Sequence, residues 1–212
     1  MTSTIIADDH EIVRRGLKGI LEGEGVCKIV AEAADGLAAT QLVERHQPAL
    51  LVLDLNLPRL HGLEVLRETR TSSPRTRVIV LSMHHDEPYV VEALRHGAMA
   101  YLLKGSETQE ILHALKEVLA GRRFLSATLS EWAINALIAK PTDADPLASL
   151  TPRERLVLQL AAEGHSNPEV AEKLFISPRT AETHRTNLLR KLGLQTQTDL
   201  VRFAIRKCLI TA

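Results

Sequence analysis

Cysteine and long apolar runs are scarce in this sequence. Its 212 residues include only two cysteines, Cys27 and Cys208, which lie far apart and have no partners at metal-ligand spacing. This pattern excludes a disulfide-rich scaffold and gives no support to a zinc site, so we expect buried or ordinary thiols. No apolar run approaches the ~18 residues of a membrane-spanning helix, and residues 1–4 lack the basic start of a signal peptide. We therefore expect a cytoplasmic protein with no membrane partner.

Net charge is also absent, because 26 Lys and Arg residues balance 26 Asp and Glu residues. The balance is uneven along the chain: 16 basic against 20 acidic residues through residue 145 give −4, and 10 against 6 after it give +4. A basic module joined to an acidic one indicates a polyanion as the partner of the C-terminal part alone. The length suits two domains, since domains commonly contain about 100–150 residues.

Five short apolar runs recur through the first 120 residues, each followed by a segment with helical periodicity. The runs are apolar without alternation, which indicates strands covered on both faces, as in a parallel sheet between two layers of helices. Five strand–helix units in succession predict an α/β domain with a five-stranded, doubly wound, flavodoxin-like parallel sheet over residues 1–120. The predicted strands span residues 4–7, 28–31, 50–53, 78–81 and 100–103.

Residues 121–147 have the composition of a linker with one helix. An amphipathic segment at 129–138 carries the only tryptophan, Trp132, and residues 140–146 contain two prolines among small polar residues. Such a composition is typical of an exposed connection between domains. We therefore expect a second domain over residues 148–212.

The second domain is predicted to be entirely helical. Three pairs each place an N-cap side chain before a proline at the first helical position: Thr151-Pro152, Asn167-Pro168 and Ser177-Pro178. Gly164 and Gly193 are suited to end helices. These signals predict four helices, over residues 152–163, 168–174, 178–192 and 197–207. The tight turn between the second and third helices has helix-turn-helix spacing.

Polar residues at the ends of the predicted strands indicate a phosphoryl-binding site. Asp8-Asp9 follows the first strand, Asp54 the third, Ser82 the fourth and Lys104 the fifth. Ligands of open parallel sheets bind beyond the carboxyl ends of the strands, so neighbouring first and third strands would bring three carboxylates together. Such a cluster needs a cation, and Mg²⁺ suits hard oxygen ligands. Ser82 and Lys104 can bind phosphoryl oxygens, and Asp54 can act as the nucleophile.

Each of these residues also has an ordinary structural interpretation. Asp9 could cap the following helix, Asp54 could begin a turn that ends at Pro58, and Lys104 could be solvated. Their joint placement at four strand ends favours a single functional site over separate structural roles.

Both parts of the chain resemble known families. Residues 1–120 resemble the receiver domain of two-component response regulators, through Asp8-Asp9, Leu53-Asp54-Leu55-Asn56-Leu57-Pro58 with Gly62, Ser82, Tyr101 and Lys104. Residues 148–210 resemble the LuxR-type DNA-binding domain, through Leu150-Thr151-Pro152-Arg153-Glu154, Gly164-His165-Ser166-Asn167, Ala171, Leu174, Ser177, Thr180, Thr183-His184 and Arg190-Lys191-Leu192-Gly193. Together these resemblances indicate the NarL/FixJ group of regulators.

The receiver resemblance implies a role for each residue of the first site. Asp54 would accept a phosphoryl group from a sensor histidine kinase. Asp8, Asp9, Asp54 and the backbone carbonyl of Asn56 would hold Mg²⁺. Lys104 would bind the phosphoryl group, with Ser82 and Tyr101 as the switch pair. The resemblance implies no enzyme beyond a receiver that catalyses its own phosphoryl transfer and loss.

Four positions depart from the family pattern or vary within it. Gly105 follows Lys104 where many receivers have proline, so the cis turn of those receivers is not expected. Asn56 and His84 occupy positions that modulate phosphoryl lifetime in the family, and the lifetime here stays open, since His84 can equally be a surface histidine. Ala181 stands where a larger aliphatic residue is usual.

The LuxR-type resemblance implies that residues 178–192 form a recognition helix in the major groove of double-stranded DNA. Glu182, Thr183 and Thr186 would approach bases, and a second group would lie nearer the phosphates: Arg179, Thr180, His184, Arg190 and Lys191. A module of this size has a modest footprint, so we expect a homodimer on adjacent half-sites, with residues 197–207 as the family's dimer contact. RNA polymerase is a further candidate partner. The alternative is a solvated surface helix.

The sequence therefore predicts a transcription regulator switched by phosphorylation at Asp54. Two other classes stay open. One is an aspartyl-nucleophile phosphohydrolase, although Asn56 stands where that chemistry has a second aspartate. The other is a constitutive DNA-binding protein whose first domain serves only as a dimer scaffold.

Overall fold

The computed structural model describes residues 1–83, 87–126, 129, 146–207 and 209–210, and it divides the chain into two compact units, residues 1–140 and 141–212. Several sequence predictions lie outside the described residues. These are the helix at 129–138 apart from Leu129, the linker at 140–145, and the residues His84, Trp132 and Cys208.

The first unit is built on a six-stranded parallel sheet with the order β2-β1-β3-β4-β5-β6. The strands β3, β4 and β5 are mostly apolar and buried, because helices cover both faces of the sheet there, whereas β2 at the edge is only partly buried. The strand order reverses between β1 and β3, which places a crevice at the carboxyl ends of those strands. The strands are β1 Thr2–Ala7, β2 Cys27–Ala33, β3 Leu50–Leu53, β4 Arg77–Ser82, β5 Ala100–Leu103 and β6 Phe124–Leu125.

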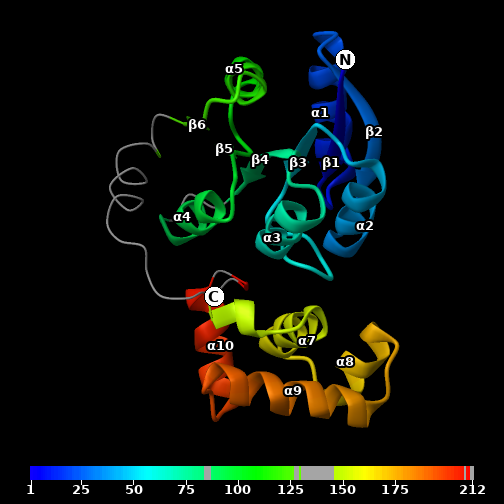
Figure 1. Ribbon diagram of the computed structural model, residues 1–212, viewed down its shortest axis with the longest axis vertical. Coiled ribbons are helices and arrows are strands. Elements are labelled where there is room, and N and C mark those ends of the chain that lie inside the picture. The colour runs from blue at the N-terminus through cyan, green and yellow to red at the C-terminus, as the bar shows by residue number, and fades with distance from the viewer. Residues whose placement is uncertain (84–86, 127–128, 130–145, 208, 211–212) are drawn as a thin grey trace. The chain divides into compact units, whose positions relative to one another are not determined.

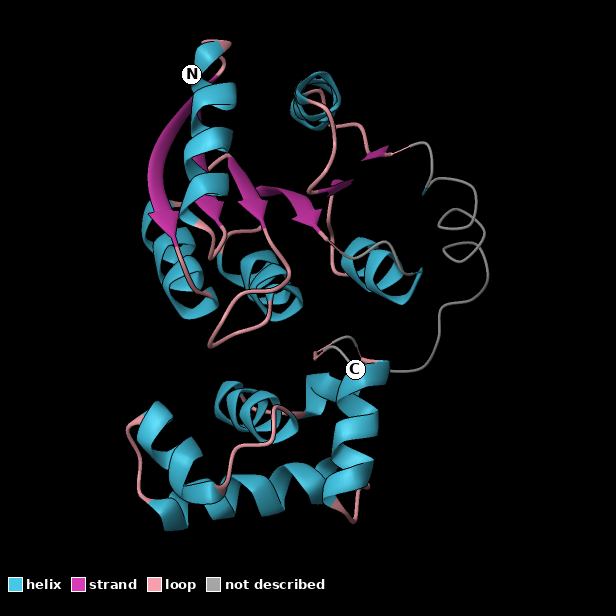
Figure 2. Ribbon diagram, turned by 180° about the vertical axis from the view of Figure 1, so that it is seen from behind, coloured by secondary structure: helices cyan, strands magenta, loops and turns pink. Residues whose placement is uncertain are grey.

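Five helices cover this sheet in two layers (Figures 1 and 2). Helices α1 and α5 contact each other on one face, whereas α2 contacts α3 and α3 contacts α4 on the other. A core cluster lies between the sheet and the first layer, with Leu17 and Leu21 of α1 and Leu115 of α5 packed against Ile6 and Ile79. The helices are α1 Glu11–Gly23, α2 Gly36–His46, α3 Gly62–Ser72, α4 Glu87–Arg95 and α5 Thr108–Leu119.

The predicted fold class is confirmed, but the sheet has six strands where the sequence predicted five. The additional strand β6 pairs parallel to β5 through Ala100↔Phe124 and Tyr101↔Leu125. A strand of two residues is too short to leave a periodic pattern, so sequence analysis had assigned these residues to the linker.

Over its described residues, the second unit contains a short 3₁₀ turn and four helices, which agree with the prediction. Helix α9 contacts both α7 and α8, and α10 contacts α7. The bounds are η1 Pro146–Ser149, α7 Pro152–Ala162, α8 Asn167–Leu174, α9 Pro178–Leu192 and α10 Gln197–Arg206. Among the helices of the described residues, none combines the length and apolarity that crossing a bilayer demands.

Side chains near the helix ends fix where these helices begin and end. The N-cap of α8 is Ser166 and not the predicted Asn167, which is the first residue of the helix. Thr151 and Glu154 form a capping box at α7, and Thr196 and Asp199 form another at α10. Such boxes satisfy N–H groups that have no partner inside the helix. Gly193 ends α9 with φ of 67°, a left-handed conformation in which glycine has no steric penalty.

Candidate functional sites

The pairing of β1 with β3 brings the predicted carboxylates together. Ala7 is opposite Leu53 in the parallel register, so Asp8 and Asp54 leave the sheet side by side. Both are almost fully buried, at 1% and 2% exposure, whereas Asp9 is exposed. One oxygen from each aspartate and one ring nitrogen of His10 lie within 4.8 Å of one another. We call these four residues the acidic cluster.

Lys104 reaches this cluster from the end of β5. Its Nζ lies 2.8 Å from Oδ2 of Asp8 and 2.8 Å from Oδ2 of Asp54. The backbone N–H of Lys104 donates to the carbonyl of Ser82, which is opposite Leu103 in the β4–β5 register. The predicted strand-end residues Asp8, Asp9, Asp54, Ser82 and Lys104 are therefore gathered at one edge of the sheet. Tyr101 lies in β5 and is fully buried.

Burial and charge pairing oppose each other in this cluster. Burial raises the pKa of the Asp54 carboxyl, and the hydrogen bond from Lys104 offsets only part of that effect. Burial would lower the pKa of Lys104, but hydrogen bonds to Asp54 and Asp8 outweigh it and raise the pKa. Lys104 is thus held as an ammonium ion, and its one positive charge is shared between the carboxylates of Asp8 and Asp54.

The acidic cluster has the donor set of a hard divalent cation. Carboxylate oxygens are the ligands that Mg²⁺ and similar ions prefer. Among the described residues, Oδ1 of Asp54 is buried and makes no hydrogen bond of regular geometry, although Oδ2 accepts from Lys104 and the backbone N–H of Asn56 also stabilises the carboxylate. A buried carboxylate oxygen without a regular hydrogen bond is costly, and a cation would compensate for it. Asn56, whose backbone carbonyl was also predicted as a ligand, follows in the exposed part of the loop after Asp54.

The loop that carries Asp54 is fixed by close backbone packing. A Cβ on Gly62 would lie 2.3 Å from the carbonyl oxygen of Asp54 and 2.6 Å from Cα of Leu55. The N–H of Gly62 also donates to the carbonyl of Leu55 at 2.8 Å. Only a residue without a side chain allows α3 to begin this close to the end of β3.

Two residues at this site, His10 and Arg14, are not indicated by the sequence pattern. Nδ1 of His10 lies 2.6 Å from Oδ1 of Asp9 and 3.3 Å from Oδ1 of Asp8. Arg14 donates from Nη1 to the backbone carbonyl of Asp8 at 2.8 Å. His10 directly follows the aspartate pair in the sequence, and this adjacency was the only available signal.

In the second unit, one side of α9 is buried and the other side is exposed to solvent. Ala181 and Leu188 are buried, whereas Leu189 and Leu192, also predicted to be buried, are partly covered. His184 is partly covered, and the other predicted DNA-contacting residues are exposed: Arg179, Thr180, Glu182, Thr183, Thr186, Arg190 and Lys191. Helix α9 therefore offers a continuous polar surface beside a buried stripe.

One predicted DNA contact has an intramolecular partner. Nζ of Lys191 lies 2.6 Å from Oε2 of Glu154, which is 3% exposed and belongs to the capping box of α7. Burial would raise the pKa of Glu154, but the hydrogen bonds from Lys191 and Thr151 outweigh it and lower the pKa. Lys191 therefore connects α9 to α7, and its predicted phosphate contact stays a prediction.

Arg185 was not among the predicted contacts and connects three helices. Its guanidinium donates to Oδ1 of Asn167 at 3.0 Å and to Oε1 of Gln197, at the starts of α8 and α10. Gln197 in turn donates to the carbonyl of Ala161 in α7 at 2.6 Å. Arg185 thus connects α9 to the starts of α8 and α10.

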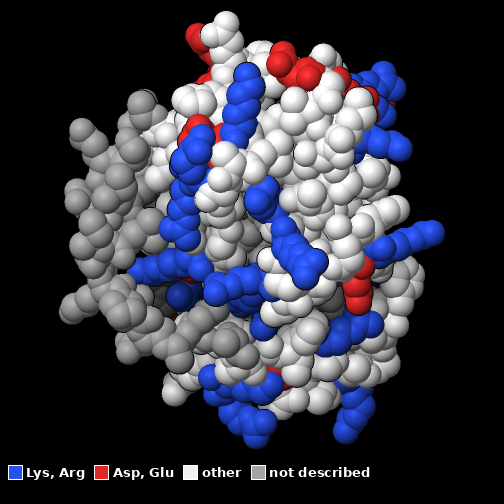
Figure 3. Space-filling model, turned by 45° about the horizontal axis from the view of Figure 1, so that its top comes forward, with Lys and Arg blue, Asp and Glu red and all other residues white. Residues whose placement is uncertain are grey.

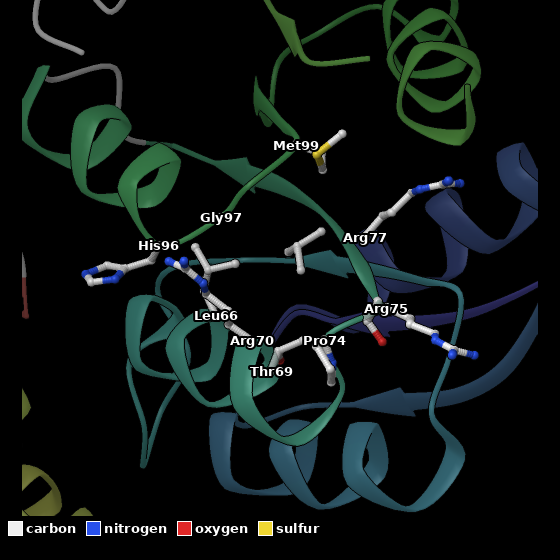
Figure 4. A pocket seen from close by; sticks show the side chains of 11 residues that line it. Leu66, Thr69, Arg70, Pro74, Arg75, Arg77, His96, Gly97 and Met99 are labelled. Atoms are coloured by element: carbon white, nitrogen blue, oxygen red, sulfur yellow. The ribbon is translucent and has the colours of Figure 1, made fainter. Parts of the chain in front are cut away.

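A cavity of about 320 Å³ lies at the opposite edge of the sheet, at the starts of β4 and β5 (Figure 4). Arg70, Arg75, Arg77 and His96 line it, and Figure 4 shows Arg75 and Arg77 pointing away from Arg70 and His96. Arg70 and Arg77 donate to the carbonyls of the last residues of α4 and α5. These arginines complement the negative ends of the two helices. Figure 3 shows many Lys and Arg side chains on the face of the molecule that it draws.

Comparisons with known proteins match both units. A model of the response regulator receiver domain matches residues 4–116, and a model of the LuxR family of bacterial regulatory proteins matches residues 148–204. The oxygen regulatory protein NreC of Staphylococcus aureus is 36% identical over 212 residues, covering 97% of this chain and 98% of NreC.

Solved structures agree with these matches. The response regulator RcsB of Salmonella typhimurium has a TM-score of 0.59 and 26% identity, covering 95% of this chain and 97% of RcsB. A structure of two RcsB dimers bound to two parallel DNAs has a TM-score of 0.59 and 25% identity, covering 97% and 98% of the respective chains.

Proposed function

The chain belongs to the two-component response regulators of the NarL/FixJ type, which join a receiver domain to a LuxR-type DNA-binding domain, and from this premise we propose that Asp54 is its phosphoacceptor. Phosphoryl transfer from a sensor histidine kinase depends on Mg²⁺ and shifts both homodimerisation and DNA binding. The proposal assigns residues 1–120 to the receiver, 121–147 to a linker and 148–212 to the DNA-binding domain.

The observation that carries this proposal is the setting of Asp54 between Asp8 and Lys104. In the proposed step, an oxygen of Asp54 attacks the phosphorus atom of a phosphohistidine. A P–O bond forms as the P–N bond breaks, and the electron pair of that bond returns to the imidazole nitrogen, which takes a proton from solvent. Lys104 favours the ionised form of Asp54 and can follow the phosphoryl oxygens as charge develops on them.

The metal contribution rests on the acidic cluster. Asp8, Asp9, Asp54 and the backbone carbonyl of Asn56 would hold Mg²⁺, which neutralises charge on the phosphoryl oxygens when it is bound. The buried Oδ1 of Asp54, which makes no hydrogen bond of regular geometry among the described residues, supports this assignment. The receiver catalyses only its own phosphoryl transfer and loss.

Ser82 and Tyr101 form the proposed switch. A phosphoryl group on Asp54 carries about two negative charges in place of the single charge of the carboxylate, and these charges attract the Ser82 hydroxyl and the Lys104 ammonium. Ser82 is the last residue of β4, and Tyr101 lies in the neighbouring strand β5, so a shift of Ser82 changes the space beside Tyr101. Shifting such a two-state element from 1:99 to 99:1 takes about 5.5 kcal/mol of differential interaction.

Helix α9 is the proposed reader of double-stranded DNA. Glu182, Thr183 and Thr186 approach bases, while Arg179, Thr180, His184, Arg190 and Lys191 lie nearer the phosphates. RcsB has been seen as dimers bound to DNA, which supports a homodimer here, with α10 as the contact. The sensor kinase is the first partner, RNA polymerase is a further one, and the cytoplasm is the proposed location.

Labelling with a small phosphodonor tests the phosphoacceptor. The wild-type protein with Mg²⁺ should gain one phosphoryl group in its intact mass, and hydroxylamine should remove it as it removes other acyl phosphates. Asp54→Asn should gain none, and Asp9→Asn should gain it more slowly. Equal labelling of wild type and Asp54→Asn would exclude Asp54 as the acceptor.

Sedimentation and DNA-binding measurements test the switch. Phosphorylated protein should sediment as a dimer and bind promoter DNA more tightly than unphosphorylated protein. Arg179→Ala and Arg190→Ala should each reduce the salt slope of log K by about 1, because each removes one phosphate contact. If phosphorylation changes neither assembly nor affinity, the receiver is a dimer scaffold and not a switch.

A further inference from the structure

The side chain of His10 does not cap the helix that it precedes. His10 is the N-cap residue of α1, where Ser, Thr, Asp or Asn commonly accept a hydrogen bond from the helix. The His10 side chain makes no such bond. Instead, its imidazole lies against the two aspartates that precede it.

The distances around His10 match those between ligands of one metal ion. Ligands at about 2.1 Å from an octahedral ion lie about 3 Å apart when they are adjacent. Nδ1 of His10 is 2.6 Å from Oδ1 of Asp9 and 3.3 Å from Oδ1 of Asp8, which bracket this spacing. The backbone N–H of His10 also donates to Oδ1 of Asp8 at 2.8 Å, which fixes the residue beside the cluster.

We propose that Nδ1 of His10 is an additional ligand of the metal site and gives it a preference for late first-row metal ions over Mg²⁺. This inference rests on the proposed function, because it assumes that a cation binds among Asp8, Asp9 and Asp54. A second observation points to the same position, since the buried Oδ1 of Asp54 makes no hydrogen bond of regular geometry among the described residues.

The chemistry of the donor set gives the direction of the preference. Sites made only of oxygen atoms suit Mg²⁺ and Mn²⁺, whereas imidazole nitrogen suits Co²⁺, Ni²⁺ and Zn²⁺. A neutral imidazole binds a metal through Nδ1 when its proton is on Nε2. The side chain of His10 is 65% exposed, so this tautomer leaves Nε2–H accessible to water.

Calorimetric titration of the full chain with Mg²⁺ and with Co²⁺ tests the proposal. We expect wild-type protein to bind Co²⁺ at least about 10-fold more tightly than Mg²⁺. His10→Phe should lose about 10-fold or more in Co²⁺ affinity and change less than about 3-fold in Mg²⁺ affinity. His113→Phe is the matched control, because its side chain is 64% exposed on α5, and it should behave as wild type.

Spectroscopy gives a readout that is independent of affinity. In the wild-type protein, Zn²⁺ binding should shift the ¹⁵N resonance of Nδ1 of His10. In Asp54→Asn, the same resonance should not shift at a Zn²⁺ concentration that saturates the wild-type protein. Unchanged Co²⁺ affinity in His10→Phe would overturn the proposal. An increase in the Mg²⁺ affinity of this variant would also overturn it, because it would show that His10 competes with the metal for Asp9.

The two hypotheses fail in different ways. If His10→Phe binds both metals as wild type does while Asp54→Asn binds them more weakly, only the role of His10 is wrong. If Asp54→Asn leaves Mg²⁺ and Co²⁺ affinity unchanged, the metals bind elsewhere, and the metal site of the proposed function fails together with the role of His10.

Discussion

Replacing Gly62 by alanine should both destabilise the first unit and disable Asp54. The added Cβ would lie 2.3 Å from the carbonyl oxygen of Asp54 and 2.6 Å from Cα of Leu55. Nonbonded atoms of this kind are comfortable only at about 3.5 Å, so one backbone segment must move by roughly 1 Å. Because both neighbouring atoms belong to the backbone, no side-chain rotation can relieve the contact.

The magnitude follows from the cost of overpacking. Inserting one methyl group into a packed region costs about 1–3 kcal/mol, and backbone neighbours place Gly62→Ala near the upper end. A displacement of about 1 Å in a reacting group commonly costs about 100-fold in rate, so phosphoryl acceptance at Asp54 should fall by that factor. Urea unfolding and labelling with a small phosphodonor measure the two effects.

Gly19→Ala provides a control of opposite sign. Gly19 lies in α1, and a Cβ there would meet nothing within 4 Å. Alanine in a helix interior should raise the free energy of unfolding by about 0.5–1 kcal/mol and leave phosphorylation unchanged. If Gly62→Ala is as stable as wild type and accepts phosphoryl at the same rate, the close approach of α3 to β3 does not position Asp54.

Three further predictions concern buried charges and their partners. Lys104→Met should lower the free energy of unfolding by about 3–5 kcal/mol, because two buried carboxylates lose their partner, and Mg²⁺ should restore part of the loss in a urea titration. Arg185→Met should destabilise the second unit by about 1–2 kcal/mol in the same assay, since it removes hydrogen bonds to the starts of α8 and α10. The pKa of Glu154 is lower in the folded protein than in the unfolded chain, where it is near 4.3, so ionised Glu154 adds to the free energy of unfolding above that pH. This contribution is lost as the pH falls through the pKa of the folded state. Acid unfolding of the second unit should therefore depend less steeply on pH in Lys191→Met; an unchanged slope would contradict the ion pair.

The strand-end residues were predictable because two simple rules combine. Uninterrupted apolar runs marked the strands, and the rule that ligands bind at the carboxyl ends of parallel strands brought Asp8, Asp54, Ser82 and Lys104 to one edge. The helices of the second unit were predictable for a similar reason, since N-cap residues, prolines and glycines lie within a few residues of each helix end.

Contacts that depend on packing were not predictable. Lys191 and Glu154 are 37 residues apart, and nothing in either helix indicates that the Lys191 side chain turns inward to α7. Gly62 was recognisable as part of a motif, but the carbonyl that excludes a Cβ there is known only from the fold. The direction of the His10 ring and the two-residue strand β6 were hidden for the same reason, because neither leaves a periodic signal.

The strand order of the first unit has a consequence for synthesis of the chain. Thr4 of β1 pairs with Leu50 of β3 and with Ile29 of β2, so the centre of the sheet forms only after long loops close. Helical units with local contacts fold faster than parallel sheets. The sheet-bearing unit leaves the ribosome first, and at about 5–20 residues per second the 72 residues of the second unit follow over several seconds. The slower-folding part therefore gains time to complete its sheet before the fast-folding helices emerge.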